Sequence, residues 1–306
     1  MQRFKNILCA VSPLKNASSA IRRASQLASR QGACLTLVDV VRDVSPTVVD
    51  GGLISDELRR EFIAERKRDM QAQIETVGFA GETDITILMG IPFIEIIKQV
   101  LRGKHDLLIK PTEGSGHRRE PLGTTDKHLL RKCPCPVWLV KPTRRKKHEH
   151  ILAAIDSDPG NPSAALNTLI LDLSTSLAAR ERTDLHVVSA WEVSCEGALH
   201  SRIGQPEVSR LIEDVRKTHM RCLKQLTDPY AQLCAKFHVH LLKGKADKVI
   251  PIEVKKRGID LTVMGTVGRV GIPGFFIGNT AERILSKVDC SVMAVKPEGF
   301  ISPVEV

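Results

Sequence analysis

The most informative pattern in this chain is IDLTVMGTVGRVGIPGFFIGNTAERILSKVDCSVMAVKP, residues 259–297. The apolar run Leu261–Met264 predicts a buried strand, and Cys290–Val295 predicts another. Asn279 and Thr280 precede apolar residues at helical spacing, which predicts that a helix begins there. Between the first strand and this helix lie five glycines, Gly265, Gly268, Gly271, Gly274 and Gly278. The order is therefore strand, glycine loop, helix, strand.

A glycine loop before a helix is a candidate anion site. Glycine lets the backbone approach a ligand closely, and the free N–H groups of a helix start favour phosphate oxygens. Such loops are common, so the pattern favours phosphate binding without identifying the ligand. The sequence contains no Gly-Lys-Ser/Thr phosphate loop, so it offers no motif for rapid ATP hydrolysis.

Length and composition predict a globular protein of about two domains. The chain has 306 residues, of which 42% are hydrophobic. No apolar run reaches the ~18 residues of a membrane span, and the first residues lack the features of a signal peptide. Eight cysteines, several within apolar runs, indicate reduced thiols. We expect a cytoplasmic protein without a membrane span.

The formal net charge of +10 suggests acidic partners, but the basic residues are mostly spread along helices. Aromatic residues make up 4% of the chain, too few for stacking platforms, and no base-reading module is visible. The one dense basic run, residues 143–149 (TRRKKHE), is interpreted as a solvated linker. We expect no specific nucleic-acid partner.

Five apolar runs alternate with helical patterns in the first half. The expected strands are Ile7–Val11, Leu35–Val41, Ile85–Met89, Leu107–Lys110 and Val137–Val140, and the expected helices are Asn16–Gln31, Asp56–Val77, Pro92–Leu101 and Thr125–Arg131. Strands separated by helices of this length predict a parallel sheet with right-handed crossovers.

The second half repeats the first. Leu129–Pro142 aligns without a gap with Ile284–Pro297, and Ile151–Ile155 mirrors Ile7–Val11. The chain is therefore predicted to be an α/β protein of two tandem five-stranded, doubly wound parallel domains, residues 1–142 and 150–306.

In such a sheet a ligand binds past the carboxyl ends of the strands, where the strand order reverses. Strands one and four meet there, so Asp156, after the first strand of the second half, should face Gly265. Asp156 would then accept hydrogen bonds from a ribose or base. The alternative is a turn or helix cap, because residues 156–161 are rich in turn formers.

The spacing Gly265-x-x-Gly268, nine residues, Gly278-Asn279 resembles the ATP-binding signature of the universal stress protein family. Asp156 after strand one and Leu185–Val187 in strand two are also similar, as are the Lys-Pro ending and Ser302–Glu305. Because the resemblance covers both halves, the chain resembles a tandem, two-domain bacterial member of that family. This implies a Rossmann-like fold of the adenine nucleotide alpha hydrolase type.

The resemblance also implies a function in stress tolerance, with ATP or another adenine nucleotide as ligand, Mg²⁺ on its phosphates, and at most slow hydrolysis. It implies pairing of the two domains through their fifth strands as a pseudo-dimer, further homodimerisation, and protein partners of unknown identity. The residues carried over to nucleotide binding are Ala154, Ile155, Asp156, Val187, Met264, Gly265, Val267, Gly268, Gly278, Asn279 and Thr280.

Both halves depart from the signature. Asn279 replaces its Ser or Thr. In the first half Pro111 stands in place of Gly265, removing an N–H. The degenerate first-domain site would consist of Ser12, Gly114, Gly123 and Thr124, and we expect it not to bind ATP in the manner of the family.

Other interpretations of the residues include an adenylating or nucleotide-hydrolysing enzyme, for which the sequence shows no nucleophile or metal cluster. The protein could be a degenerate scaffold acting through partners or an apolar, lipid-like ligand near Phe275 and Phe276. His238 and His240 share a strand face, but no third ligand is evident, so we expect no metal site. Cys133 and Cys135 are interpreted as buried thiols or a redox pair.

Overall fold

The computed structural model describes residues 4–12, 16–41, 56–113, 122–143, 148–160, 164–193, 196–197, 204–266 and 277–306. The chain divides into two compact units. The first unit comprises Arg3–Lys146 together with Phe300–Val306, and the second unit comprises Lys147–Gly299.

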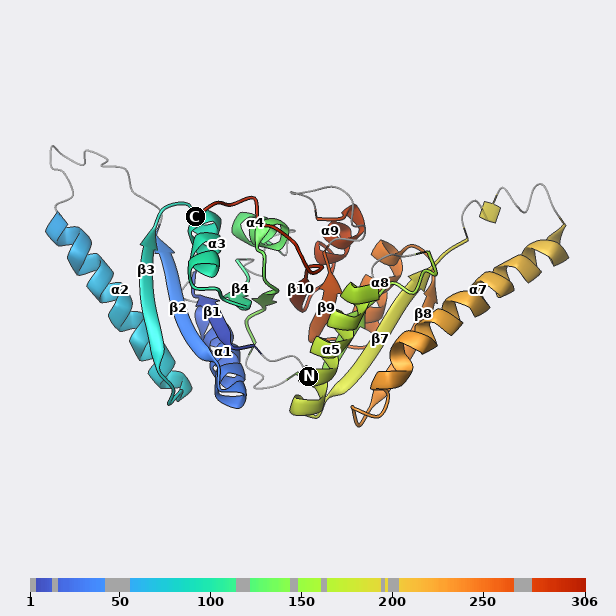
Figure 1. The fold of residues 1–306 in the computed structure, drawn as a ribbon, viewed down its shortest axis with the longest axis horizontal. Coiled ribbons are helices and arrows are strands. Elements are labelled where there is room, and N and C mark those ends of the chain that lie inside the picture. The colour runs from blue at the N-terminus through green and yellow to red at the C-terminus, as the bar shows by residue number, and fades with distance from the viewer. Residues whose placement is uncertain are drawn as a thin grey trace. The chain divides into compact units, whose positions relative to one another are not determined.

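The first unit is a five-stranded parallel sheet between two pairs of helices. Its strands are β1 (Asn6–Ala10), β2 (Cys34–Val41), β3 (Thr83–Met89), β4 (Leu107–Pro111) and β5 (Val137–Val140), and its helices are α1 (Ala17–Gln31), α2 (Asp56–Val77), α3 (Pro92–Arg102) and α4 (Thr124–Lys132). The strand order is β3-β2-β1-β4-β5, with every pairing parallel. Helix α1 packs against α2, and α3 packs against α4 (Figure 1).

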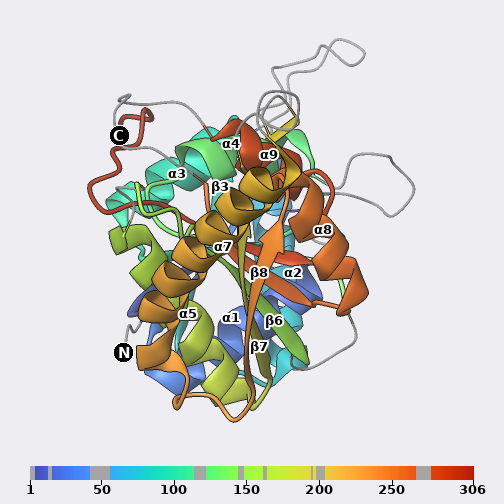
Figure 2. The same ribbon diagram turned by 90° about the vertical axis from the view of Figure 1, so that its right-hand side faces the viewer.

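The second unit repeats this arrangement. Its strands are β6 (His150–Ala154), β7 (Asp184–Trp191), β8 (Phe237–Lys243), β9 (Leu261–Gly265) and β10 (Ser291–Val295), and its helices are α5 (Ala164–Glu181), α7 (Gln205–Thr227), the short η2 (Asp228–Tyr230), α8 (Ala246–Lys256) and α9 (Asn279–Leu285). The order is β8-β7-β6-β9-β10, again parallel. Helices α7 and α8 lie on either side of β8 (Figure 2). The predicted doubly wound α/β fold in two tandem copies is confirmed.

Local sequence explains these elements. The central strands β1 and β4 are buried on both faces, which is why they are continuous apolar runs rather than alternating ones. Helix α1 lays a stripe of small residues, among them Ala20, Ala24 and Ala28, on the sheet. It ends at Gly32, whose φ of 63° is the left-handed conformation that favours glycine at this position.

Two further boundaries follow from the structure. Helix α9 ends at Leu285, because Lys287 and Val288 both donate their N–H groups to Ile284 O and close the last turn. Val288, three residues beyond the end of this helix, is buried. The expected second domain includes residues 300–306, but Phe300–Val306 groups with the first unit. Strand β10 ends at Val295, and Gly299, between this strand and Phe300, has a φ of 79°.

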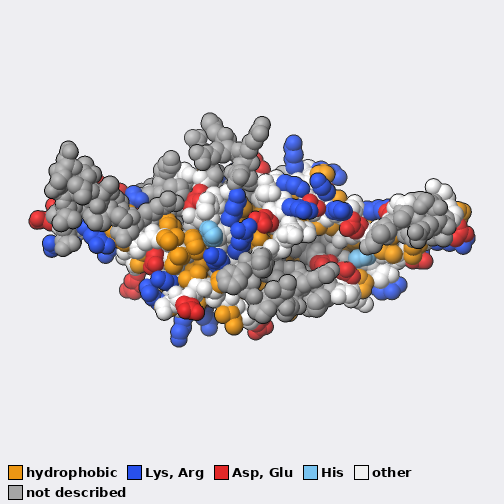
Figure 3. Space-filling view, turned by 90° about the horizontal axis from the view of Figure 1, so that it is seen from above, with side chains coloured by type: hydrophobic (Ala, Val, Ile, Leu, Met, Phe, Trp, Pro, Cys, Tyr) orange, Lys and Arg blue, Asp and Glu red, His pale blue; other side chains and the backbone are white. Residues whose placement is uncertain are grey.

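Two further expectations concern membrane-spanning helices and the distribution of charged residues. None of the described helices is both long and apolar enough to cross a membrane. On the face seen in Figure 3, Lys and Arg side chains are interspersed with Asp and Glu side chains. This mixture agrees with basic residues spread along solvated helices.

Candidate functional site

The carboxyl edge of the second unit brings the ends of β6 and β9 together. The two strands are parallel neighbours, with Ala154 paired to Met264. Chain order reverses at this pair, since β9 leads to β10 on one side and β6 leads to β7 on the other. Asp156 follows β6 and Gly265 ends β9, so both lie at the switch point where open α/β sheets bind ligands.

Asp156 is exposed at this edge and also shapes its own turn. Its Oδ1 accepts a hydrogen bond from the Asp158 N–H at 3.0 Å. The backbone of Asp156 is fixed to α5 by Asn167, whose Oδ1 accepts from Asp156 N at 3.1 Å and whose Nδ2 donates to Asp156 O at 2.6 Å. The turn interpretation is therefore correct, and it presents the carboxylate to solvent rather than burying it. Sequence analysis missed Asn167, the one amide in the apolar start of α5.

The glycine loop is closed at its base. Gly278 N donates to Thr266 O at 2.8 Å, so the two ends of the loop meet directly beyond β9. The buried Lys296 ammonium donates to Thr266 Oγ1 at 3.3 Å, which adds positive charge beneath the loop. Gly265 packs closely against α5: an added Cβ there would lie 2.7 Å from Leu166 Cδ2, so the Leu166 side chain would have to shift.

The other predicted binding residues differ in their surroundings. Gly278, Asn279 and Thr280 form the start of α9, where Asn279 and Thr280 are exposed. Ala154, Ile155 and Met264 are buried in the sheet or just past it. Val187 lies inside β7, paired with Ala153 and Val239, so its position gives no support to a contact with adenine. Val267, Gly268, Gly114, Phe275 and Phe276 lie outside the described residues.

The corresponding edge of the first unit holds a buried ion pair. Lys110, in β4, has no exposed surface, and its Nζ lies 2.9 Å from Asp126 Oδ1, which is equally buried in α4. Lys110 Nζ also donates to Pro111 O at 3.0 Å. Asp126 Oδ2 accepts from Glu113 N at 3.0 Å and from Gly123 N at 3.2 Å. The start of α4 is thus neutralised by the chain itself.

Glu113 completes this arrangement. Its carboxylate accepts from Thr125 N at 3.3 Å, lies 3.5 Å from Lys110 Nζ, and covers Gly123 so closely that an added Cβ would overlap it. A carboxylate therefore occupies the helix start where a phosphate would bind. Lys110 and Asp126 have no charged counterparts in the second unit, where Met264 and Ala281 occupy their positions.

Ser12 also differs from its counterpart Asp156. The Ser12 hydroxyl donates to Asp39, a buried carboxylate that is paired with Arg66 of α2 at 2.7 Å. In the second unit Ser189 occupies the position of Asp39, and its hydroxyl forms a hydrogen bond of 2.8 Å with the Ser157 hydroxyl. The first unit therefore turns the polar group at this position inward, whereas the second unit leaves Asp156 exposed.

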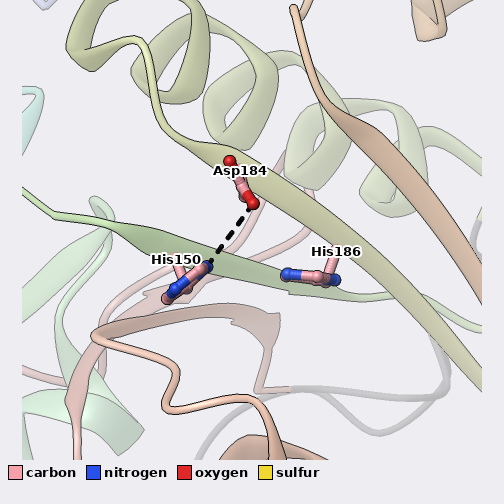
Figure 4. A group of neighbouring side chains, drawn as sticks. All are labelled: His150, Asp184 and His186. Carbon is pink, nitrogen blue, oxygen red and sulfur yellow. Dashed lines mark ion pairs between the residues drawn. The ribbon is translucent and has the colours of Figure 1, made fainter.

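A separate cluster of imidazoles lies at the opposite edge of the second unit. His186 stacks on His238, with ring centroids 4.7 Å apart, and its Nδ1 lies 3.2 Å from His240 Nε2. Burial, together with His238 and His240, lowers the pKa of His186 to about 4, so its ring is neutral near pH 7. His150 and Asp184 lie close by, with ligand atoms within 4.8 Å of one another and of His186 (Figure 4). Strand pairing places His186 beside His238, a neighbour that the sequence spacing does not reveal.

Cys133 and Cys135 are both buried, with their sulfur atoms 3.6 Å apart. A hydrogen bond with Cys133 and burial raise the pKa of Cys135, which keeps this thiol protonated. Since the thiolate is the reactive form, the geometry favours a packing function for this pair.

Comparison with known proteins agrees with the sequence signature. The model of the universal stress protein family matches residues 3–141 and 147–296. Universal stress protein E of Escherichia coli is 29% identical over 317 residues, covering 100% of this chain and 98% of the relative. Universal stress protein E of Photorhabdus laumondii is 27% identical over 321 residues, covering 100% and 99%.

Solved structures share the fold. A functionally unknown protein from Pseudomonas aeruginosa PAO1 has a TM-score of 0.71 and 23% identity, covering 97% of this chain and 94% of that one. A universal stress protein from Archaeoglobus fulgidus has a TM-score of 0.65 and 16% identity, covering 95% and 98%. With a family domain found twice in tandem across almost its whole length, the chain belongs to the universal stress protein family.

Proposed function

We propose that the protein binds an adenine nucleotide at the carboxyl edge of its second unit and acts in stress tolerance without strong catalysis. Family membership supports the stress-response role, and the Gly265–Asn279 spacing supports the ligand. Seven described cysteines are free thiols, which supports a reducing, cytoplasmic setting.

The observation that carries the proposal is the contrast between the two units. In the first unit Lys110, Asp126 and Glu113 neutralise the start of α4 from within. The second unit has Met264 and Ala281 in the place of that pair, and it keeps the signature glycines and an exposed Asp156. The second unit thus lacks the buried Lys110–Asp126 pair at the start of its last helix, which makes that helix start the better candidate for a phosphate ligand.

Titration calorimetry of the full chain with ATP, ADP and AMP, each with and without Mg²⁺, tests this proposal. We expect saturable binding, and we expect Asp156→Ala to weaken it about ten- to a hundred-fold, equal to roughly 1–3 kcal/mol, because a ribose or base loses a charged acceptor.

Two variants separate ligand contact from turn formation. Asp156→Asn keeps an acceptor for the Asp158 N–H but removes the charge. Asp158→Asn alters the neighbouring carboxylate, whose Oδ1 accepts from Gly160 N, and should leave binding unchanged. Absence of heat and of a thermal shift with every nucleotide would refute the proposal. Native mass spectrometry would then look for a retained apolar ligand, as the scaffold alternative requires.

A further inference from the structure

Strand register gathers five ligand-type side chains on one face of the second unit. His150 is paired with Asp184, and His186 is paired with His238. Residues two apart along a strand share a face, so Asp184 and His186 lie on the same side of β7. His238 and His240 do the same on β8. The members come from three strands, which is why sequence spacing does not reveal the cluster.

Three of these side chains converge on one point. The ligand atoms of His150, Asp184 and His186 all lie within 4.8 Å of one another, and His150 Nδ1 is 3.8 Å from Asp184 Oδ2 (Figure 4). Among the described residues, His150 Nδ1 has no hydrogen-bond partner although it is shielded from water. Two ligands of one tetrahedral ion, each at about 2.0–2.2 Å from it, lie roughly 3.4 Å apart. The three side chains would therefore have to move inward only slightly to bind one ion.

The surroundings orient the ligands. His186 Nδ1 is engaged with His240 Nε2 at 3.2 Å, which directs the other ring nitrogen toward His150 and Asp184, as Figure 4 shows. Asp184 Oδ1 lies 3.2 Å from the ammonium of Lys236, so Oδ2 is the oxygen turned to His150. To bind a metal through its other nitrogen, His186 would carry its proton on Nδ1 and donate it to His240 Nε2, since metal-binding histidines characteristically donate their second ring N–H.

We propose that His150, Asp184 and His186 bind a borderline divalent transition ion, with Zn²⁺ as the best fit, and that His240 is a positioning residue. Two imidazoles and one carboxylate suit Zn²⁺, whereas Mg²⁺ prefers six oxygen ligands in an octahedron. Three protein ligands leave a fourth position for water or an external group.

The two units differ at this place as they do at the other edge. The register positions of His150, Asp184 and His186 are held in the first unit by Asn6, Cys34 and Thr36. The first unit therefore shows that the fold does not require these histidines. The cluster also lies at the amino ends of β6 and β7, away from Asp156 at the carboxyl edge, so the two proposals are independent.

Cobalt substitution tests the metal site directly. The full chain, without an affinity tag, is treated with a chelator, and Co²⁺ is titrated in while the visible spectrum is recorded. We expect one Co²⁺ per chain with the strong d–d bands of a tetrahedral site and no thiolate charge-transfer band. Zn²⁺ should displace the Co²⁺, and a large excess of Mg²⁺ should not.

Variants taken from the first unit make the test specific. His150→Asn and His186→Thr introduce the residues that the first unit carries, and each should weaken binding more than about a hundred-fold, because outer-sphere changes alone cost about 10–100-fold. His240→Gln should fall in that outer-sphere range. His219→Asn, a histidine of α7 outside the cluster, is the matched control and should bind as the wild type does. Should His186→Thr fail to fold, the half-exposed His150 provides the decisive variant.

Two results would overturn the proposal. One is the lack of tetrahedral bands at a several-fold molar excess of Co²⁺. The other is unchanged binding in His150→Asn, or a thiolate band that disappears after alkylation of the cysteines, which would assign the metal to thiols. Asp156→Ala should leave Co²⁺ binding intact, and His150→Asn should leave nucleotide binding intact.

Discussion

At the residue scale, Lys110 and Asp126 show how a strand end becomes unavailable to a ligand. Both side chains lack exposed surface, and they form an ion pair with 2.9 Å between Lys110 Nζ and Asp126 Oδ1. A buried pair of this kind adds little net stability over an apolar pair of similar volume, but removing one partner leaves an uncompensated charge. The apolar pair already exists in the same fold, as Met264 and Ala281.

We therefore expect Lys110→Met to lower the free energy of unfolding of the first unit by about 3–5 kcal/mol, because Asp126 loses its cation. The double variant K110M/D126A, which reproduces the pair of the second unit, should recover a large part of that loss. Urea unfolding followed by circular dichroism measures both. A double variant no more stable than Lys110→Met would contradict this account.

Gly265 offers a second residue-scale prediction. Gly265→Ala should destabilise the second unit by about 1–3 kcal/mol, since the added Cβ would lie 2.7 Å from Leu166 Cδ2. Combined with Leu166→Ala, its cost should be at least about 0.5 kcal/mol smaller than in the wild-type background, because the opposing side chain is gone. Thermal unfolding of the four proteins gives the coupling. Strict additivity would mean that this contact does not explain the glycine.

At the element scale, α8 contains Pro251 in its interior. Proline lacks the N–H that would bond the carbonyl four residues earlier, Asp247 O. The structure supplies a substitute donor, because Lys287, just beyond α9, donates from Nζ to Asp247 O at 2.7 Å. Helix α8 is therefore completed by a side chain from the segment after its neighbouring helix.

Lys287→Met should accordingly cost about 1–3 kcal/mol of unfolding free energy, the range for leaving a buried acceptor unpaired. In the Pro251→Ala background the cost should shrink, because the restored backbone N–H can bond Asp247 O. Hydrogen exchange of α8 together with urea unfolding measures the effect. An equal cost in both backgrounds would show that Lys287 acts through some other contact, such as its 3.4 Å approach to the Asp247 carboxylate.

At the scale of the whole molecule, one fold occurs twice with two different edges. The first unit fills its carboxyl edge with Lys110, Glu113 and Asp126, and the second unit keeps Asp156 and the glycine loop. Duplication thus preserved the strand order while the two edges diverged.

We expect the full chain to bind one adenine nucleotide, not two. The reason is that the carboxylate of Glu113 covers Gly123 and the start of α4, which a phosphate would otherwise contact. Calorimetric titration or equilibrium dialysis with ATP gives the stoichiometry. Two equivalent sites per chain would show that Glu113 moves aside and that the first unit is competent.

Much of this organisation could be predicted from the sequence. The long helix Asp56–Val77 and the strand Val137–Val140 have the predicted boundaries, because their charge and apolar patterns are local. The adjacency of β6 and β9 followed from the repeat and the rules of parallel sheets. The expected strand Leu107–Lys110 ends at Lys110, but nothing in the sequence indicates that Asp126, sixteen residues later, neutralises it.

The sequence by itself determined the duplicated α/β fold, the family and the candidate loop, because apolar periodicity and glycine spacing are properties of short stretches of chain. Only the tertiary structure decided which side chains meet across strands: Glu113 over Gly123, Lys287 at Asp247, and His150 and Asp184 beside His186. These contacts depend on strand register and on side-chain direction across tens of residues, and a shift of a single residue in register would place each side chain on the opposite face.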